Sequence, residues 1–238
     1  SIICSIIFAL VFCLPTSQLI IWYFSDSALN IFTNLQLLIN STFVGVFASC
    51  VTVFFAISLA LSFRQLNSLK PLIIISTSGY AIPGSVISAG LLIGFDFLFD
   101  TSITFYGIFG LIICLALRFM TPAFNYISTS LLNISKSAEY ALATQPSNQL
   151  KAFSYFYLPQ MKPAIYLSLM LVFIESVKDQ PSTLLLRPLG FDTLSTKIYN
   201  FTSEGQWEMA AGPSLFLVAI SLIFVYVINK NIDISESK

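Results

Sequence analysis

Six long apolar runs, separated by short polar segments, constrain the fold of this chain more than any other feature. They cover residues 2–23, 40–63, 71–94, 102–124, 164–186 and 209–229. A helix needs about 20 mostly apolar residues to cross the hydrocarbon core of a bilayer. Because lipid cannot satisfy backbone N–H and C=O groups, such runs cross as helices. The sequence therefore predicts an all-α, polytopic membrane protein with six transmembrane helices in one bundle, forming a single domain over residues 1–238.

The composition supports this class and excludes others. Hydrophobic residues make up 56% of the chain and charged residues 9%, whereas soluble proteins average about 45–50% and about 25%. A net charge of zero argues against nucleic acid as a partner. Because histidine is absent, neither His-based acid–base catalysis nor His metal ligation is available. We expect no cofactor or metal on this chain, and the cysteines inside the apolar runs should act as small hydrophobes: Cys4, Cys13, Cys50 and Cys114.

The basic residues predict the orientation of the bundle. Basic residues favour the cytoplasmic side of membrane proteins. If the polar segment 129–160 lies in the cytoplasm, the alternation of spans places most of them on or near that side. The cytoplasmic set is Arg64, Lys70, Arg118, Lys136, Lys151, Lys162, Lys230 and Lys238, and the outer set is Lys178, Arg187 and Lys197. Both termini are therefore expected in the cytoplasm.

The segment 129–160, here called the coupling segment, is more patterned than a plain connector between spans. A short helix can carry Glu139 in its first turn, where a negative charge is favourable. Pro146 would end that helix, and Ser147 could cap a second one. The second helix carries a narrow apolar stripe at helical spacing: Leu150, Phe153 and Tyr157. We interpret the segment as a docking site for a soluble partner; the alternative is a connector whose aromatic side chains lie in the membrane interface.

Motifs for nucleotide binding and for nucleophilic catalysis are missing from the sequence. No GxxxxGK[ST] phosphate-binding loop occurs, so the chain cannot bind ATP by that route. A Ser/His/Asp or Cys/His set is impossible without histidine. If transport is coupled to ATP, the energy must come from another polypeptide through a cytoplasmic contact, and the coupling segment is the largest candidate surface.

The coupling segment resembles the EAA loop of binding-protein-dependent ABC importer permeases. That loop has the pattern E-A-A, a Gly four residues after the second Ala, and a final I-x-L-P. In AEYALATQPSNQLKAFSYFYLP, Tyr140 takes the Glu place with Glu139 one residue early, Ala141 and Leu142 take the Ala places, Pro146 takes the Gly place, and Phe156-Tyr157-Leu158-Pro159 form the end. The resemblance implies ATPase coupling through Glu139, Tyr140, Ala141, Leu142, Pro146, Ser147, Leu150, Phe153, Tyr157, Leu158 and Pro159.

Further stretches are similar to the ferric-iron subgroup of these permeases. They are GYAIPGSV (79–86), LRFMTPAFN (117–125) and ESVKDQPSTLLLRPLGFDTLSTKIY (175–199). The similarity matches the second half of the usual two-half iron permease, and the chain begins with Ser1 rather than Met, so we expect part of a longer polypeptide. The resemblance implies a bacterial inner-membrane importer for ferric iron that works by alternating access. Its implied partners are ABC ATPase subunits, a second permease half (fused or separate), an extracytoplasmic substrate-binding protein and the lipid bilayer.

Small residues around Pro83 mark a first candidate gate. Tyr80, Pro83 and Gly84 lie inside an apolar run, where a proline can kink a helix to line a pathway. Equally, small residues can serve close helix packing. Both interpretations stay open on the sequence.

Charged residues in the fifth apolar run mark a second candidate gate. Glu175, Lys178 and Asp179 share a helical face, which permits local pairing. If the span starts at Ala164, Glu175 lies about 16 Å along it, near mid-bilayer. An ionisable group there indicates a function, and the alternative is a charge pair that only locks two helices. Arg118, near the end of its own span, is expected to extend to the membrane interface.

The outer segment 187–207 is expected to contain a short helix on the membrane surface. Asp192 can cap it, and Leu194, Ile198 and Phe201 lie along one side. Two other classes of function stay open for the chain. An ion-gradient-driven secondary transporter would use Glu175 and Asp179 as its ion site, and a membrane-embedded enzyme would need polar groups in the outer region. Permeases for thiamine, phosphonates or polyamines would have similar sequences.

Overall fold

The computed structural model describes residues 2–25, 31–65, 70–99, 103–135, 137 and 152–236, and within these ranges it contains helices and no strand. The all-α prediction is confirmed. The elements are α1 (Ile2–Phe8), the π-helix η1 (Ala9–Cys13), α2 (Leu14–Ser25), α3 (Ile31–Gln65), α4 (Lys70–Thr77), the 3-10 helix η3 (Ser78–Ala81), α5 (Gly84–Phe99), α6 (Ile103–Arg118), α7 (Met120–Leu132), the π-helix η4 (Phe153–Tyr157), α10 (Leu158–Lys178), α11 (Gln180–Leu186), α12 (Leu194–Ser203) and α13 (Trp207–Glu236).

Four of the described helical stretches are long and apolar enough to cross a membrane alone. They are Ile3–Ser25, Asn34–Arg64, Phe153–Lys178 and Trp207–Val227. Two bent helix pairs reach the same length and composition together, which gives up to six spans. The bends lie inside the predicted runs 71–94 and 102–124, so neither run is one straight helix. The chain is therefore a multi-pass helical membrane protein with broken spans.

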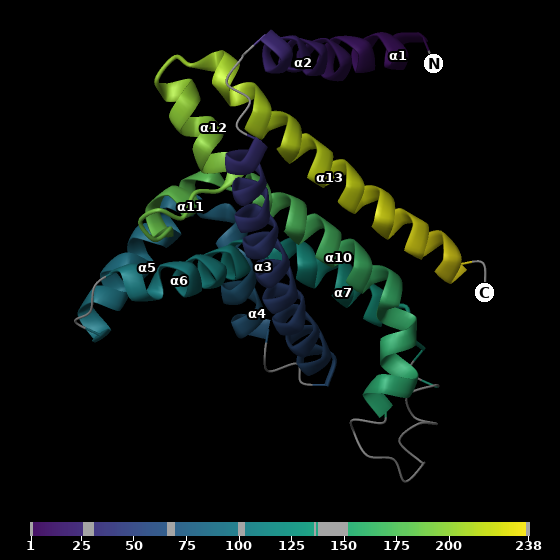
Figure 1. The fold of residues 1–238 in the computed structure, drawn as a ribbon. Coiled ribbons are helices and arrows are strands. Elements are labelled where there is room, and N and C mark those ends of the chain that lie inside the picture. Colours follow the sequence, from purple (N-terminus) through teal and green to yellow (C-terminus); the bar gives the residue numbers. More distant parts are fainter. Residues whose placement is uncertain are drawn as a thin grey trace.

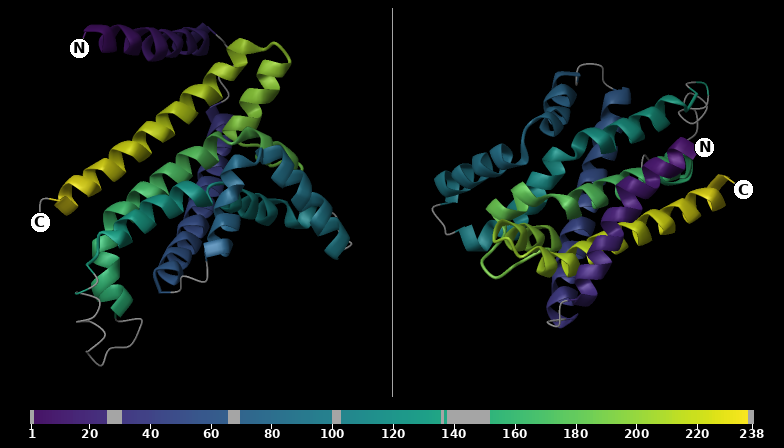
Figure 2. Two further views of the ribbon diagram at one scale, coloured as in Figure 1. Left: turned by 180° about the vertical axis from the view of Figure 1, so that it is seen from behind. Right: turned by 90° about the horizontal axis from the view of Figure 1, so that it is seen from above.

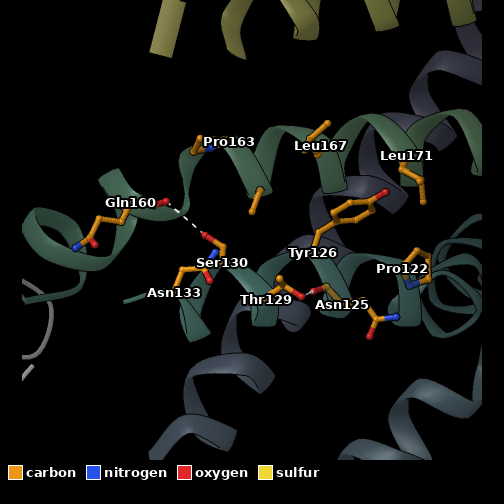
Figure 3. Close-up of a pocket in the computed structure, with 11 residues that line it drawn as sticks. Pro122, Asn125, Tyr126, Thr129, Ser130, Asn133, Gln160, Pro163, Leu167 and Leu171 are labelled. Carbon is orange, nitrogen blue, oxygen red and sulfur yellow. Dashed lines mark hydrogen bonds between the residues drawn. The ribbon is translucent and has the colours of Figure 1, made fainter. Parts of the chain in front are cut away.

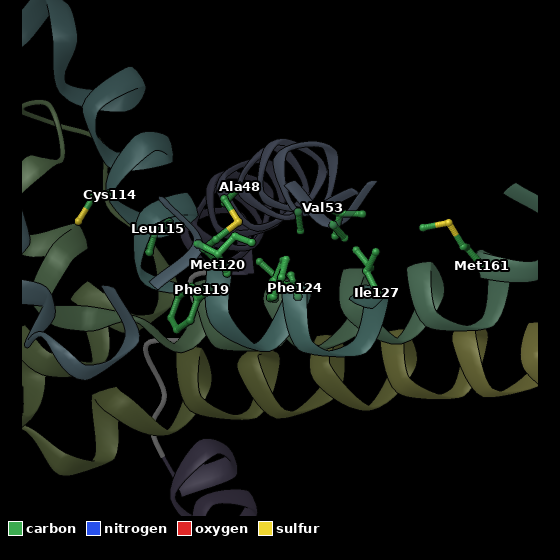
Figure 4. Close-up of a cluster of buried hydrophobic side chains, with 14 of the residues drawn as sticks. Ala48, Val53, Cys114, Leu115, Phe119, Met120, Phe124, Ile127 and Met161 are labelled. Carbon is green, nitrogen blue, oxygen red and sulfur yellow. The ribbon is translucent and has the colours of Figure 1, made fainter. Parts of the chain in front are cut away.

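The core of the bundle forms where α7 and α10 pack on α3. Met120, Phe124 and Ile127 on α7 point toward Ala48 and Val53 on α3 (Figure 4). In a membrane, lipid is as apolar as the side chains, so close van der Waals packing rather than water exclusion holds helices together. The buried surface fits this rule because it contains many small residues: Ala48, Ala56 and Ala60 on α3, and Ala123 on α7.

A glycine brings α3 closest to α10. A Cβ at Gly45 would lie 2.7 Å from Cγ2 of Val177 and 2.9 Å from ring atoms of Phe173. Only a residue without a side chain fits there without movement of the neighbours. The contact fixes the upper half of α10, and through it the position of the residues that follow.

Three of the helices break in the middle of the bundle. Between η3 and α5, Ile82 is extended because it precedes Pro83, and the helices on either side form an angle of 118°. At Phe119, with φ −97° and ψ 14°, α6 turns into α7 by 51°. Asp179 is extended (φ −69°, ψ 104°) between α10 and α11. The predicted run 164–186 is therefore also two helices.

The first predicted run lies apart from the others. Figures 1 and 2 show α1, η1 and α2 crossing one end of the bundle, where α2 contacts α13. None of the side chains described in this stretch is buried. The fold thus leaves nearly all of this apolar helix open to the surroundings.

The outer segment contains the expected short helix, but with a different cap. Thr193, not Asp192, is the N-cap of α12: its Oγ1 accepts from the N–H of Thr196, and the Thr196 hydroxyl bonds back in a reciprocal capping box. Asp192 instead forms an ion pair with Arg187. In Figure 1, α12 lies at the opposite end of the bundle from η4.

Candidate functional site

A groove of about 650 Å³ runs between α7 and α10 (Figure 3). Its lining residues are Pro122, Asn125, Tyr126, Thr129, Ser130 and Asn133 from α7 and its C-cap, and Gln160, Pro163, Ala164, Leu167 and Leu171 from α10. Amide and hydroxyl groups dominate the α7 wall, and none of the lining residues is charged. The groove therefore offers neutral hydrogen-bonding groups along an otherwise apolar helix pair.

The α7 wall of the groove is an exposed polar face opposite a buried apolar one. Asn125, Tyr126 and Thr129 are exposed, whereas Ala123 and Ile127 on the other side of the helix are fully buried. Polar groups inside a membrane segment are costly against lipid and usually face protein or a water-filled cavity. Hence this face of α7 indicates a wall of an aqueous path or of a contact with another chain.

Hydrogen bonds join one end of the groove to the end of the coupling segment. The hydroxyl of Ser130 donates to the carbonyl O of Gln160 at 3.4 Å, and Nε2 of Gln160 donates to the carbonyl O of Phe156 at 2.9 Å. Pro159 and Pro163 lack the N–H groups that would strengthen this part of α10. The groove and η4 are therefore directly connected through Gln160.

Most of the predicted coupling residues lie outside the described residues: Glu139, Tyr140, Ala141, Leu142, Pro146, Ser147 and Leu150. Of the others, Leu158 and Pro159 begin α10. Tyr157 and its neighbour Phe156 pack against the core, while Phe153 is only partly buried and is not part of that packing. Tyr157 is thus an anchor for the segment, whereas Phe153, which is also partly buried, is not part of the core packing.

The first candidate gate lies at the break before α5. Tyr80 is exposed, with its ring 6.4 Å from that of Phe119. Pro83 is exposed and Gly84 is buried. A Cβ on Gly84 would collide with the guanidinium of Arg118. The first gate and the α7–α10 groove are lined by different residues, so the structure does not join them into one site.

The expected position of Arg118 was wrong. Its side chain turns inward at the α6–α7 break and forms an ion pair with Asp179, whose side chain is 3% exposed. Asp179 also accepts from the N–H of Ser182 at 3.2 Å, which makes it the N-cap of α11. The carboxylate of Asp179, which is held in place by its role as a cap, keeps the Arg118 guanidinium inside the bundle. If Arg118 extended to the interface, Asp179 would be left buried and unpaired.

The second candidate gate is two separate pairs rather than one cluster. Nζ of Lys178 donates to Oε1 of Glu175 at 2.8 Å, within α10. Asp179 does not share that helical face, because α10 ends at Lys178. Within the described ranges no group of three or more Asp, Glu or Cys side chains could hold a metal ion. The geometry gives no support to a carboxylate ion site of the kind that a secondary transporter would need here.

The close contact at Gly84 predicts a local stability effect. Gly84→Ala should lower the free energy of unfolding by about 1–3 kcal/mol, since overpacking moves Arg118 or Ser182. Gly90, in the same helix, has nothing within 4 Å of an added Cβ. Gly90→Ala should therefore stay within about 0.5 kcal/mol of the parent. Unfolding in detergent, followed by circular dichroism, compares the two; equal losses would show that the Gly84 contact is not tight.

The broken-helix bundle has the fold of ABC transporter permeases. It aligns with a chain of the crystal structure of a bacterial alginate ABC transporter in complex with an alginate pentasaccharide-bound periplasmic protein, with a TM-score of 0.72 over 96% of this chain and 91% of that chain, at 16% identity. No protein-family model matches the chain.

Sequence relatives agree with this fold. The chain is 29% identical over 204 residues to the ferric transport system permease protein FbpB of Actinobacillus pleuropneumoniae, which covers 78% of this chain and 29% of that protein. It is 26% identical over 206 residues to the spermidine/putrescine transport system permease protein PotC homolog of Mycoplasma genitalium, covering 81% and 69%. The chain thus spans less than a third of the length of its ferric relative. The predicted resemblance to ABC importer permeases, including the ferric subgroup, is confirmed.

The neutral groove was not among the sites predicted from the sequence, which were the coupling segment and the two candidate gates. A signal was available: Asn125, Thr129 and Asn133 recur at a spacing of four, which is one helical face. They begin directly after the apolar run 102–124 and continue the same helix. A polar stripe at the end of a predicted span is therefore the pattern that identifies this wall.

Proposed function

We propose that this chain is the permease subunit, or the permease part, of an ATP-driven ABC importer in the bacterial inner membrane, with ferric iron as its cargo. Separate ATPase subunits, a second permease half and an extracytoplasmic binding protein complete the transporter. The similarity to FbpB supports the cargo, and the alginate transporter fold supports the class. The observation that carries the proposal is the exposed polar face of α7, which a helix surrounded only by lipid would not keep.

In this proposal, the coupling segment and the groove act as one device. Closure of the ATPase subunits moves the coupling segment, and η4 and the start of α10 transmit the movement to the groove wall through Gln160 and Ser130. The groove is then exposed to one side of the membrane and afterwards to the other. A shift between two such states requires a partner that binds them with different affinity, and the ATPase supplies it.

The chemistry of the groove suits passage rather than storage. Fe³⁺ is a hard cation that favours carboxylate and phenolate oxygens, and the groove offers amides, aliphatic hydroxyls and the Tyr126 phenol. A pathway must bind its cargo weakly enough to release it. A ferric cargo would therefore be bound only weakly as it moves through this neutral lining, with tight recognition left to the binding protein.

Uptake by the assembled transporter tests the proposal. The chain, produced together with the second permease half, the ATPase subunits and the binding protein, should move ⁵⁵Fe³⁺ into proteoliposomes that contain ATP and Mg²⁺. A non-hydrolysable ATP analogue, or loss of the ATPase catalytic glutamate, should abolish uptake. Transport driven by a proton or sodium gradient without the ATPase would contradict the class.

Competition in the same assay separates the cargoes. The spermidine/putrescine relative raises polyamines as an alternative, and the neutral groove lining offers no carboxylate to either cation. Excess spermidine, 2-aminoethylphosphonate or thiamine should leave ⁵⁵Fe³⁺ uptake unchanged. Strong inhibition by one of them would replace ferric iron as the cargo while keeping the transporter class.

A further inference from the structure

The three helix breaks meet at the Arg118–Asp179 ion pair. Arg118 is the last residue of α6, directly before the α6–α7 break. Asp179 is itself the break between α10 and α11. Gly84, which follows the third break, lies against the guanidinium and against Oγ of Ser182. The pair therefore links all three interruptions of the bundle at one point.

Each partner in the pair has further contacts that hold it in place. The Asp179 backbone carbonyl accepts from Oγ1 of Thr183 at 2.6 Å and from Oγ of Ser195 at 3.4 Å. The Arg118 guanidinium carbon lies 5.4 Å from the centre of the Phe119 ring. These contacts come from α11, α12 and the α6–α7 junction, so the pair is anchored from several elements.

The breaks divide the helices into two groups. In one group, α11 packs against α5 and α6; in the other, α7 packs against α10. Figure 1 shows the α5–α6–α11 group diverging from the α7–α10 group, with α3 crossing between them. Phe119 and Asp179 are the covalent links between the groups. Arg118 is the residue next to the Phe119 link, and its ion pair connects that link to Asp179, which is the second link.

We propose that Arg118 and Asp179 are positioning residues that fix the angle between the α5–α6–α11 group and the α7–α10 group. An extended residue such as Asp179 and a kink such as Phe119 each allow rotation about the backbone. The ion pair between the two links restricts this backbone rotation, because rotation at Phe119 would also have to move Asp179. The groove wall on α7 and α10 then keeps a defined orientation relative to the opposite end of the bundle.

A variant pair separates this role from simple stability. Asp179→Asn keeps the helix cap, since asparagine caps as well as aspartate, and it removes the charge. Combined with Arg118→Met, it leaves no unpaired charge inside the bundle. Replacing a buried ion pair with neutral groups of similar size is often tolerated. The double variant is therefore expected to fold while it loses the link between the two groups.

Distances between the two groups report the outcome. Spin labels are placed at Leu185 on α11 and Leu132 on α7, both exposed, after serine replaces the exposed cysteines Cys4, Cys13 and Cys50. Double electron–electron resonance on the chain in lipid nanodiscs should give one narrow distance distribution for the parent. The double variant should widen it at least twofold, and Arg118→Lys, which keeps the charge, should leave it narrow.

A matched control uses the other ion pair. Glu175→Gln with Lys178→Met removes a pair within a single helix, so the distribution should stay narrow. A folded double variant of Arg118 and Asp179 with the parental width would overturn the proposal, as would equal widening in the control. If the double variant does not fold, Asp179→Asn alone is measured against the same two outcomes. This readout needs neither ATP nor cargo, so its failure is distinct from a failure of the proposed transport function.

A second prediction rests on the proposed function. In the reconstituted importer, the double variant Arg118→Met with Asp179→Asn should raise the ATP hydrolysed per ⁵⁵Fe³⁺ transported at least threefold. A role in stability alone would lower the yield of transporter and leave that ratio unchanged.

Discussion

Leucine at both Asn125 and Thr129 should reduce ATP-dependent uptake at least about tenfold, which corresponds to about 1.4 kcal/mol in the barrier. These side chains form the middle of the exposed polar face of α7. Leucine would remove their hydrogen-bonding groups and narrow the groove, so a hydrated or ligated cation would lose the neutral contacts that replace its water. The measurement is initial uptake of ⁵⁵Fe³⁺ by proteoliposomes, normalised to the amount of assembled transporter. The folding of each variant is checked by circular dichroism in detergent before uptake is compared.

A serine on another helix provides the matched control. Ser221 on α13 donates to the carbonyl O of Leu217 within its own helix, and its neighbours Leu222 and Ile223 are exposed apolar residues. Ser221→Leu also replaces a polar side chain with leucine, but on a helix whose neighbouring exposed residues are apolar. It should keep uptake near the parental rate. If the groove variant also transports normally, the polar face of α7 is a protein contact and not a pathway wall.

Aspartate at Leu150 and Phe153 should abolish capture of the ATPase subunit while the spans still insert. Burying one large apolar side chain in an interface contributes about 1.5–3 kcal/mol, so losing two and adding charges should weaken binding by more than about a hundredfold. Phe153 is partly buried but does not join the core, so the substitution leaves the packing of Phe156 and Tyr157 intact. Pull-down of the tagged ATPase from solubilised membranes measures the effect.

The control for this prediction lies at the other end of the bundle. Leu189, between α11 and α12, is 95% exposed. Leu189→Asp adds a charge to an exposed apolar position without touching the coupling segment, and it should leave the pull-down unchanged. Retained capture with both Leu150 and Phe153 replaced would show that the ATPase binds elsewhere.

The architecture could be predicted from the sequence because it depends on a large-scale property. Apolar runs of span length leave the backbone no alternative to helices in lipid, and Pro83 also gave a visible sign of the first break. The other two breaks were harder to foresee. Phe119 has neither glycine nor proline beside it, and its kink is set by what Arg118 and Thr121 bind: Asp179 and the carbonyl O of Thr77. Such a cause is tertiary, and periodicity does not contain it.

The error at Asp179 has a more instructive reason. Helical spacing placed it on one face with Glu175 and Lys178. However, Asp179 followed two residues later by Pro181 is also a helix start, with an acidic N-cap and a proline in the first turn. Local capping chemistry outweighed periodicity here. At α12 the error was between two possible caps: Asp192 was predicted, whereas Thr193 is the cap through its reciprocal bond with Thr196.

The π-helix η4 gives the end of the coupling segment a wider helical turn than the α-helix that follows it. In η4 the N–H of Leu158 bonds to the carbonyl O of Phe153, five residues back, so each turn holds one residue more than an α-turn. Phe153 and Tyr157 are both partly buried, and of the two Tyr157 packs against the core. A single residue inserted or deleted at this turn would rotate what precedes it by about 100° about the axis of α10. The length of five residues thus sets the angular position of the coupling segment relative to the groove wall on α10.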